Sequence, residues 1–184
     1  MRTLYKSVAL ALLAAQAGAA CAADDLAVQV ERNGRSFGVH AVATVAAPVS
    51  LVWEVLTDYE KLPQFIPGIS KSIVQAREAN RVVVEQTGEA RFLVFSFPIE
   101  VRLEVRESPQ TSVVSRAVAG NLRRMEGRYE LHLDGGSVRL HYSGEMEPDF
   151  GLPRVVGTLL VRSMVEEQFT AMVAEIERRA APAK

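Results

Sequence analysis

A two-glycine turn at Gly135–Gly136 constrains the fold of this chain more than any other feature, because such a turn fixes how the flanking segments pair. Apolar and polar residues alternate through both segments, which is typical of antiparallel strands that bury one face. The pairing that this turn sets places the apolar residues of both segments on one face of the hairpin, with no bulge or shift needed. The predicted inward pairs are Leu133 with Val138, Leu131 with Leu140, Tyr129 with Tyr142, Gly127 with Gly144, and Met125 with Met146.

The region before this hairpin predicts another hairpin and two short helices. Asn33–Gly34 is a dipeptide typical of a type I′ turn, and it separates two segments, 28–31 and 36–45, that we expect to pair as strands. A proline then opens a segment with helical spacing, for which we expect a helix near 48–58 and a short helical turn near 60–66.

From residue 70 onward the apolar period changes from that of a helix to that of a strand. Apolar and charged residues alternate from 99 to 106, which predicts a strand with one buried face. We expect this strand to pair with the preceding one so that Arg91 lies opposite Glu104 and Glu89 lies opposite Arg106. This register would match opposite charges across the pair.

The end of the chain predicts one long amphipathic helix of about 28 residues, from Leu152–Pro153 to a point before Pro182. Its apolar stripe consists of Val161, Val165, Phe169, Met172 and Ile176. A curved antiparallel sheet must bury its inner face, and this helix is the predicted element long enough to cover it. We therefore expect an α+β fold in which a curved antiparallel sheet of about seven strands wraps around the C-terminal helix, with two short helices after the first long strand.

Three stretches of the sequence share a pattern of apolar residues and turns with a known family. They are VWEVLTDYEKLPQFIPGISKS, the hairpin segments MEGRYELHL and VRLHYSGEMEP, and VEEQFTAMVAEIE in the last helix. The pattern resembles the START-like (SRPBCC) superfamily, specifically its coenzyme Q-binding and polyketide cyclase/dehydrase-type domains, from about Phe37 to Arg179. The resemblance implies a helix-grip fold with a ligand cavity, and it specifies the fold better than the function. Where relatives often place a tryptophan in the cavity, this chain has Met125 or Tyr129.

The beginning of the chain has the three parts of a secretory signal. Arg2 and Lys6 precede an apolar run at 8–15, and small residues follow that fit a cleavage site. We expect a periplasmic or secreted mature protein without a transmembrane segment, because the apolar run is too short to span a bilayer. In one alternative Cys21 is the lipidated first residue of a lipoprotein, and in another the segment stays uncleaved as an anchor.

The sequence divides into a signal peptide at 1–23, one START-like helix-grip domain at 24–181 and a tail at 182–184. Cys21 is the only cysteine, so the domain has no internal disulfide. The stability of the domain must therefore come from its core.

The titratable residues form no recognisable catalytic or metal-binding motif. His40, His132 and His141 lack the spacing of metal ligands, and the chain has neither GxSxG nor a glycine-rich phosphate loop. The formal net charge of −1 gives no reason to expect nucleic acid as a partner. We assign no catalytic residue, metal or cofactor, and we expect a monomer whose partner is a hydrophobic small molecule.

We predict an exported binding protein that holds a lipid, isoprenoid, quinone or polyketide-like molecule between the sheet and the last helix. Small inward residues favour open space there, namely Gly88, Ala90, Ala117, Gly127 and Gly144. The alternatives are a cyclase/dehydratase-type enzyme that acts on an apolar substrate, and a protein-interaction module with a filled core. The residues expected to contact the ligand are Trp53, Tyr59, Phe65, Pro67, Phe92, Met125, Gly127, Tyr129, Tyr142, Gly144, Leu160 and Met164.

Overall fold

The computed structural model describes residues 26–92, 95–149 and 154–182, and these contain eight strands and four helical segments. The strands are β1 (Ala27–Asn33), β2 (Ser36–Val45), β3 (Ile69–Glu78), β4 (Arg81–Phe92), β5 (Phe95–Ser108), β6 (Ser112–Gly120), β7 (Leu122–Asp134) and β8 (Ser137–Pro148). The helical segments are α1 (Val49–Thr57), the 3₁₀ turn η1 (Tyr59–Lys61), α2 (Leu62–Phe65) and α3 (Arg154–Ala180). Among the described helices, none is long and apolar enough to cross a membrane.

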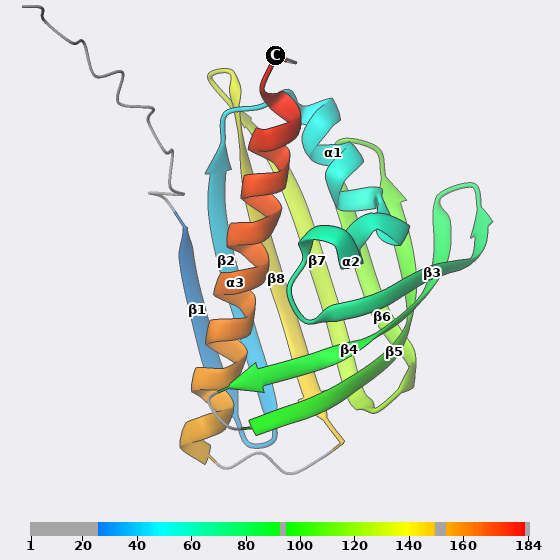
Figure 1. The fold of residues 1–184 in the computed structure, drawn as a ribbon, viewed down its shortest axis with the longest axis vertical. Helices are drawn as coiled ribbons and strands as arrows, with labels where there is room; N and C mark the ends of the chain where they lie inside the picture. Colours follow the sequence, from blue (N-terminus) through cyan, green and yellow to red (C-terminus); the bar gives the residue numbers. More distant parts are fainter. Residues whose placement is uncertain (1–25, 93–94, 150–153, 183–184) are drawn as a thin grey trace, which may run out of the picture.

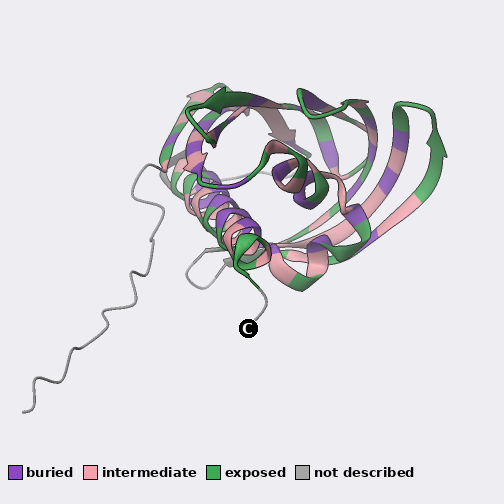
Figure 2. Ribbon diagram, turned by 90° about the horizontal axis from the view of Figure 1, so that it is seen from above, coloured by how far each residue is buried: buried purple, intermediate pink, exposed green. Residues whose placement is uncertain are grey.

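The strands of the described residues form one antiparallel sheet in the order β1-β2-β8-β7-β6-β5-β4-β3. The sheet curves around α3, which lies along its open side (Figures 1 and 2). The predicted fold class is therefore confirmed, with eight strands instead of about seven. The strand that the sequence marks least clearly is β3, in which Ser72 is the one buried residue.

The hairpin of β7 and β8 has the predicted register. Gly135 and Gly136 have positive φ angles of 55° and 99°, as the predicted turn requires. All the pairs expected from this turn are present, including Tyr129 with Tyr142 and Gly127 with Gly144, but Leu133 next to the turn is 75% exposed and not buried as predicted. The two-residue turn therefore determined the pairing from Asp134 back to Arg124, beyond which the register shifts before Leu122.

The turn between β1 and β2 lies one residue later than expected. Asn33 pairs with Ser36, so the two turn residues are Gly34 and Arg35. Gly34 takes a positive φ of 64°, whereas neither Asn33 nor Arg35 does. Because only one turn residue has a positive φ, the expected type I′ assignment was wrong, although the hairpin itself is confirmed.

The register expected for β4 and β5 was wrong. Arg91 pairs with Ser96 and Glu89 pairs with Pro98, so neither lies opposite the predicted partner. The hairpin closes earlier, where Phe92 pairs with Phe95. This closure has no glycine, asparagine or aspartate to mark it in the sequence.

Helix α3 contributes its apolar stripe to the core, as predicted, and each of the five stripe residues is buried. The helix packs against β1 and β2 at one end of the sheet and against β4 near the other end. It also contacts α1 and α2. The middle strands of the curved sheet therefore face α3 across an interior space rather than through close backbone packing.

Candidate ligand-binding site

A cavity of about 230 Å³ lies between the inner face of the sheet and α3. Most of its wall is apolar, and side chains from β2, β4, β5, β6, β7, β8 and α3 contribute to it. Four of the five methionines of the chain line the cavity, namely Met125, Met146, Met164 and Met172. Methionine is flexible and polarisable, so a wall rich in methionine adapts its shape to an apolar guest.

Three aromatic rings connect the floor of the cavity to α3. The ring centroids of Tyr129 on β7 and Tyr142 on β8 are 4.7 Å apart. Each centroid is also 5.9 Å from that of Phe169 on α3. These distances are typical of favourable aromatic pairs, so the two tyrosine rings are held between the sheet and the helix.

The hydroxyl groups of Tyr129 and Tyr142 have no hydrogen-bond partner within the described part of the chain, and both residues line the cavity. Burial raises the pKa of Tyr129 well above its usual range, and the nearby Tyr142 adds to this effect. Burial also raises the pKa of Tyr142 to about 12. Both hydroxyls are therefore protonated at neutral pH and can donate a hydrogen bond to a group in the cavity.

The facing glycines Gly127 and Gly144 make room for the ring of Tyr142. A Cβ atom at Gly127 would lie 2.8 Å from the Tyr142 hydroxyl oxygen, and one at Gly144 would lie 2.5 Å from it. Gly88 is small for a different reason, because a Cβ atom there would lie 1.8 Å from the backbone oxygen of Gly68. These small residues therefore accommodate close contacts, and the expectation that they leave open space was wrong at these positions.

Tyr59 also lines the cavity, but its hydroxyl is already engaged. It donates a hydrogen bond of 2.9 Å to Oε1 of Glu107, which Arg77 also contacts at 3.2 Å. Burial, together with the negative charge of Glu107, raises the pKa of Tyr59 well above its usual range. This hydroxyl therefore stabilises the fold, and its hydrogen is not available to a ligand.

The cavity wall has few charged groups. Within the described residues its lining includes no lysine, arginine or histidine, and its two acidic residues, Glu89 and Glu145, alternate along β4 and β8 with inward neighbours, so their carboxylates lie on the outer side of the sheet. Glu89 pairs with Arg91 and accepts a hydrogen bond of 2.7 Å from Ser96, while Glu145 lies 3.4 Å from Arg124. The charged groups of the wall are thus paired with residues outside it, and the remaining polar groups are neutral.

The predicted ligand-contacting residues separate into three groups. The structure brings one group together at the cavity wall: Tyr59, Met125, Tyr129, Tyr142, Gly144, Leu160 and Met164. Another group is not part of the wall: Trp53, Phe65, Pro67 and Gly127. The side chain of Phe92 lies outside the described residues. Which of the wall residues contact a ligand stays a prediction.

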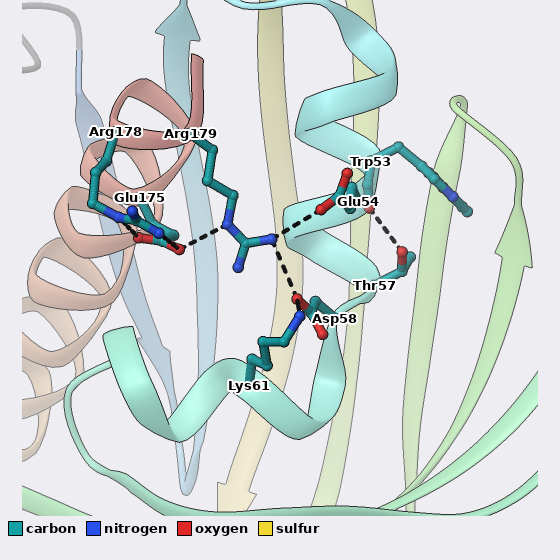
Figure 3. Close-up of polar contacts among 8 residues, drawn as sticks. All are labelled: Trp53, Glu54, Thr57, Asp58, Lys61, Glu175, Arg178 and Arg179. Carbon is teal, nitrogen blue, oxygen red and sulfur yellow. Dashed lines mark hydrogen bonds and ion pairs between the residues drawn. The ribbon is translucent and has the colours of Figure 1, made fainter. Parts of the chain in front are cut away.

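Phe65 lies beside an ion-pair network that joins the end of α3 to α1. The Arg179 guanidinium is 5.7 Å from the centroid of the Phe65 ring, and its nitrogens contact Glu175 at 2.7 Å and Asp58 at 3.2 Å. Figure 3 shows the contacts of Arg179 with Glu175 and Asp58, with the Trp53 side chain pointing away from Arg179. Phe65 therefore supports the packing of helices.

Several wall residues were not among the predicted ligand contacts. Phe169 and Met172 lie on the apolar stripe of α3, and Met146 lies opposite Met125 on the inner face of the hairpin. Each position could have been identified from the same periodicity that predicted the elements. Gln168 lies beside the stripe and donates a hydrogen bond of 3.4 Å to the backbone oxygen of Pro67, a contact that no local pattern indicates.

The chain matches the family model described as polyketide cyclase / dehydrase and lipid transport over residues 45–173. No curated protein matches it. Among solved structures, the Zhui aromatase/cyclase from Streptomyces sp. R1128 is similar with a TM-score of 0.66 and 20% identity, over 79% of this chain and 96% of that one.

Two further solved structures have similar folds. A START superfamily protein from Mycobacterium smegmatis has a TM-score of 0.65 and 17% identity, over 77% of this chain and 98% of that one. A STAR-related lipid transfer protein from Xanthomonas axonopodis has a TM-score of 0.63 and 13% identity, over 84% of this chain and 99% of that one. The family match and the shared START-like helix-grip fold lead to one assignment. This chain belongs to the polyketide cyclase/dehydrase and lipid transport family.

Proposed function

We propose that this protein is an exported binding protein that holds one hydrophobic small molecule in the cavity between the sheet and α3. The observation that carries the proposal is the cavity of about 230 Å³, whose mostly apolar wall includes four methionines. Such a wall favours a lipid, isoprenoid, quinone or polyketide-like molecule, because transfer of apolar surface out of water is the main source of affinity.

The groups on the wall favour binding over catalysis. Proton transfer at neutral pH is most effective from a group whose pKa is near 7. The pKa values of Tyr129 and Tyr142 are raised, to about 12 for Tyr142, so neither hydroxyl is a base at neutral pH. The carboxylate of Glu89 has a lowered pKa because Arg91 and Ser96 donate hydrogen bonds to it.

Export is part of the proposal and rests on the sequence. Two basic residues, an apolar run at 8–15 and small residues near Cys21 are typical of a secretory signal. The segment lies outside the described residues. Cell fractionation with mass measurement of the mature N-terminus tests this step, and a full-length chain found only in the cytoplasm would contradict it.

A cavity-filling variant tests the binding site. Ala90 lines the cavity and is buried, so Ala90→Phe should place a ring in the ligand space. Ala119 on β6 is exposed and is not part of the wall, which makes Ala119→Phe the matched control. We expect the folded Ala90→Phe protein to bind the neutral fluorescent probe N-phenylnaphthylamine at least tenfold more weakly than wild type, and Ala119→Phe to bind it normally.

If Ala90→Phe does not fold, Val101→Phe provides a second variant, because Val101 lines the cavity from β5. Circular dichroism establishes that each variant is folded. Unchanged probe binding by a folded cavity-filling variant would contradict the proposed site. Turnover of a bound substrate by the wild-type protein would instead favour the cyclase/dehydratase alternative.

A further inference from the structure

The polar groups of the cavity indicate what kind of hydrophobic molecule fits it. We infer that the cavity selects a neutral ligand, such as a ketone, quinone or amide, whose buried oxygen accepts hydrogen bonds from the hydroxyls of Tyr129 and Tyr142. This inference rests on the proposed binding function and narrows it to a ligand class.

The hydroxyls of Tyr129 and Tyr142 are available to such an oxygen, whereas those of Tyr59 and Ser115 are already used. Tyr59 donates to Glu107 at 2.9 Å, and Ser115 donates to the backbone oxygen of Gly127 at 3.5 Å. By contrast, Tyr129 and Tyr142 make no hydrogen bond with any described residue through their hydroxyls. A ligand oxygen would therefore accept hydrogen bonds from donors that no other described residue uses.

The two donors are held in place before a ligand arrives. Their rings contact each other and Phe169, with centroid distances of 4.7 to 5.9 Å. The Tyr142 ring is further confined by the backbones of Gly127 and Gly144, where even a Cβ atom would collide with it. Since only the hydroxyl hydrogens remain free to rotate, binding costs little side-chain entropy.

The wall disfavours an anionic ligand. A carboxylate or phosphate placed there would lose its hydration, and the described part of the wall offers it no lysine, arginine or histidine. The two acidic residues of the lining, Glu89 and Glu145, alternate with inward neighbours and direct their carboxylates to the outer side of the sheet, so the charges nearest the cavity offer an anion no attraction. Their cationic partners, Arg91 and Arg124, are already engaged in ion pairs.

Matched pairs of probes test the inference, because each pair keeps its shape and changes its charge. Decanamide is compared with decanoate, and naphthamide with naphthoate, by competition with N-phenylnaphthylamine at pH 7. We expect at least one amide to bind about tenfold or more tightly than its acid. Tyr129→Phe and Tyr142→Phe should each weaken amide binding by about threefold to tenfold, the usual effect of one lost hydrogen bond.

An acid that keeps its carboxylate hydrated outside the cavity does not reach the two hydroxyls, so the variants should leave the affinities for decanoate and naphthoate almost unchanged and reduce the preference for the amide. His132→Ala on the outer face serves as the control and should change none of these affinities. Equal binding of acid and amide, or amide affinities that both phenylalanine variants leave unchanged, would overturn the inference.

The experiment distinguishes this inference from the proposed function on which it rests. If the wild-type cavity binds N-phenylnaphthylamine but neither amide, the inference fails while the binding function stands. If the cavity binds neither the fluorescent probe nor any of the four competitors, the proposed function itself fails.

Discussion

The ring of Tyr142 lies against the backbone of Gly144, so that a Cβ atom added to Gly144 would be 2.5 Å from the Tyr142 hydroxyl oxygen and 2.8 Å from its Cζ atom. Gly144→Ala must therefore displace this ring. We expect it to lower the free energy of unfolding by about 1–3 kcal/mol, as other overpacked sites do. Urea unfolding monitored by circular dichroism measures the change.

Two further variants establish that Tyr142 causes this effect. Gly38→Ala is the matched control, because its Cβ atom would meet nothing closer than 3.9 Å, and we expect little loss of stability. Replacing Tyr142 with valine should remove the clash, so Gly144→Ala should cost less in that background than in the wild type. Equal costs in both backgrounds would show that Tyr142 is not responsible.

Gly88 on β4 lies against the backbone of Gly68, the residue that precedes β3. A Cβ atom at Gly88 would lie 1.8 Å from the Gly68 oxygen, which also accepts a hydrogen bond of 2.8 Å from the Glu89 amide. Because a backbone atom cannot move aside as a flexible side chain can, Gly88→Ala should cost more than Gly144→Ala, by our estimate about 3 kcal/mol or more. A thermal-unfolding midpoint close to that of wild type would contradict this packing.

The hydroxyl of Tyr59 contributes to stability through Glu107. Tyr59→Phe removes a hydrogen bond to a carboxylate that also contacts Arg77, and we expect a loss of about 1–3 kcal/mol. Denaturant titration of the purified variant measures this loss. In a Glu107→Gln background the loss of stability should be smaller. An equally large loss in that background would show that the Tyr59 hydroxyl does not stabilise the protein through Glu107.

The ion pairs of Glu175 near the end of α3 make the stability of the protein depend on pH (Figure 3). Hydrogen bonds from Arg178, and to a smaller extent from Arg179, outweigh burial and lower the pKa of Glu175 from 4.5 to about 2. A lowered folded-state pKa stabilises the protein above the unfolded-state value, and this contribution is lost as the pH falls from about 5 to about 2. We expect Glu175→Gln to be less stable than wild type at pH 7 by about 1–3 kcal/mol.

The pH series provides the check on this assignment. The stability difference between wild type and Glu175→Gln should shrink steadily below pH 5. Arg178→Gln should behave similarly, with a smaller difference, because Arg179 remains beside Glu175 at 2.7 Å. A difference that stays constant between pH 7 and pH 3 would argue against a lowered pKa.

The sequence predicted those parts of the fold in which a local signal coincides with the hydrophobic period. Gly135–Gly136 fixed the pairing of β7 and β8, and the 3.6-residue period identified the buried stripe of α3. The sequence did not predict the register of β4 and β5, because Phe92 and Phe95 close that hairpin without a typical turn residue. An apparent match of opposite charges suggested the wrong register, since exposed ion pairs contribute little energy.

The candidate site was harder to predict than the fold. Tyr129 and Tyr142 were correctly placed on the inner face, because the hairpin register determines which way they point. The ring of Tyr142 lies over two glycines, and this contact depends on a side-chain rotamer that the sequence does not specify. The position of Phe65 beside Arg179 depends on how α2 meets α3, a tertiary contact without any local pattern.

Mass spectrometry of organic extracts from the exported, detergent-free protein tests the central claim most directly. If the cavity holds a neutral hydrophobic ligand, wild type and Ala119→Phe should yield the same neutral molecule at close to one per chain, and folded Ala90→Phe should yield much less. A wild-type protein that is repeatedly empty and also fails to bind N-phenylnaphthylamine, or an extracted molecule that Ala90→Phe retains in full, would contradict the account.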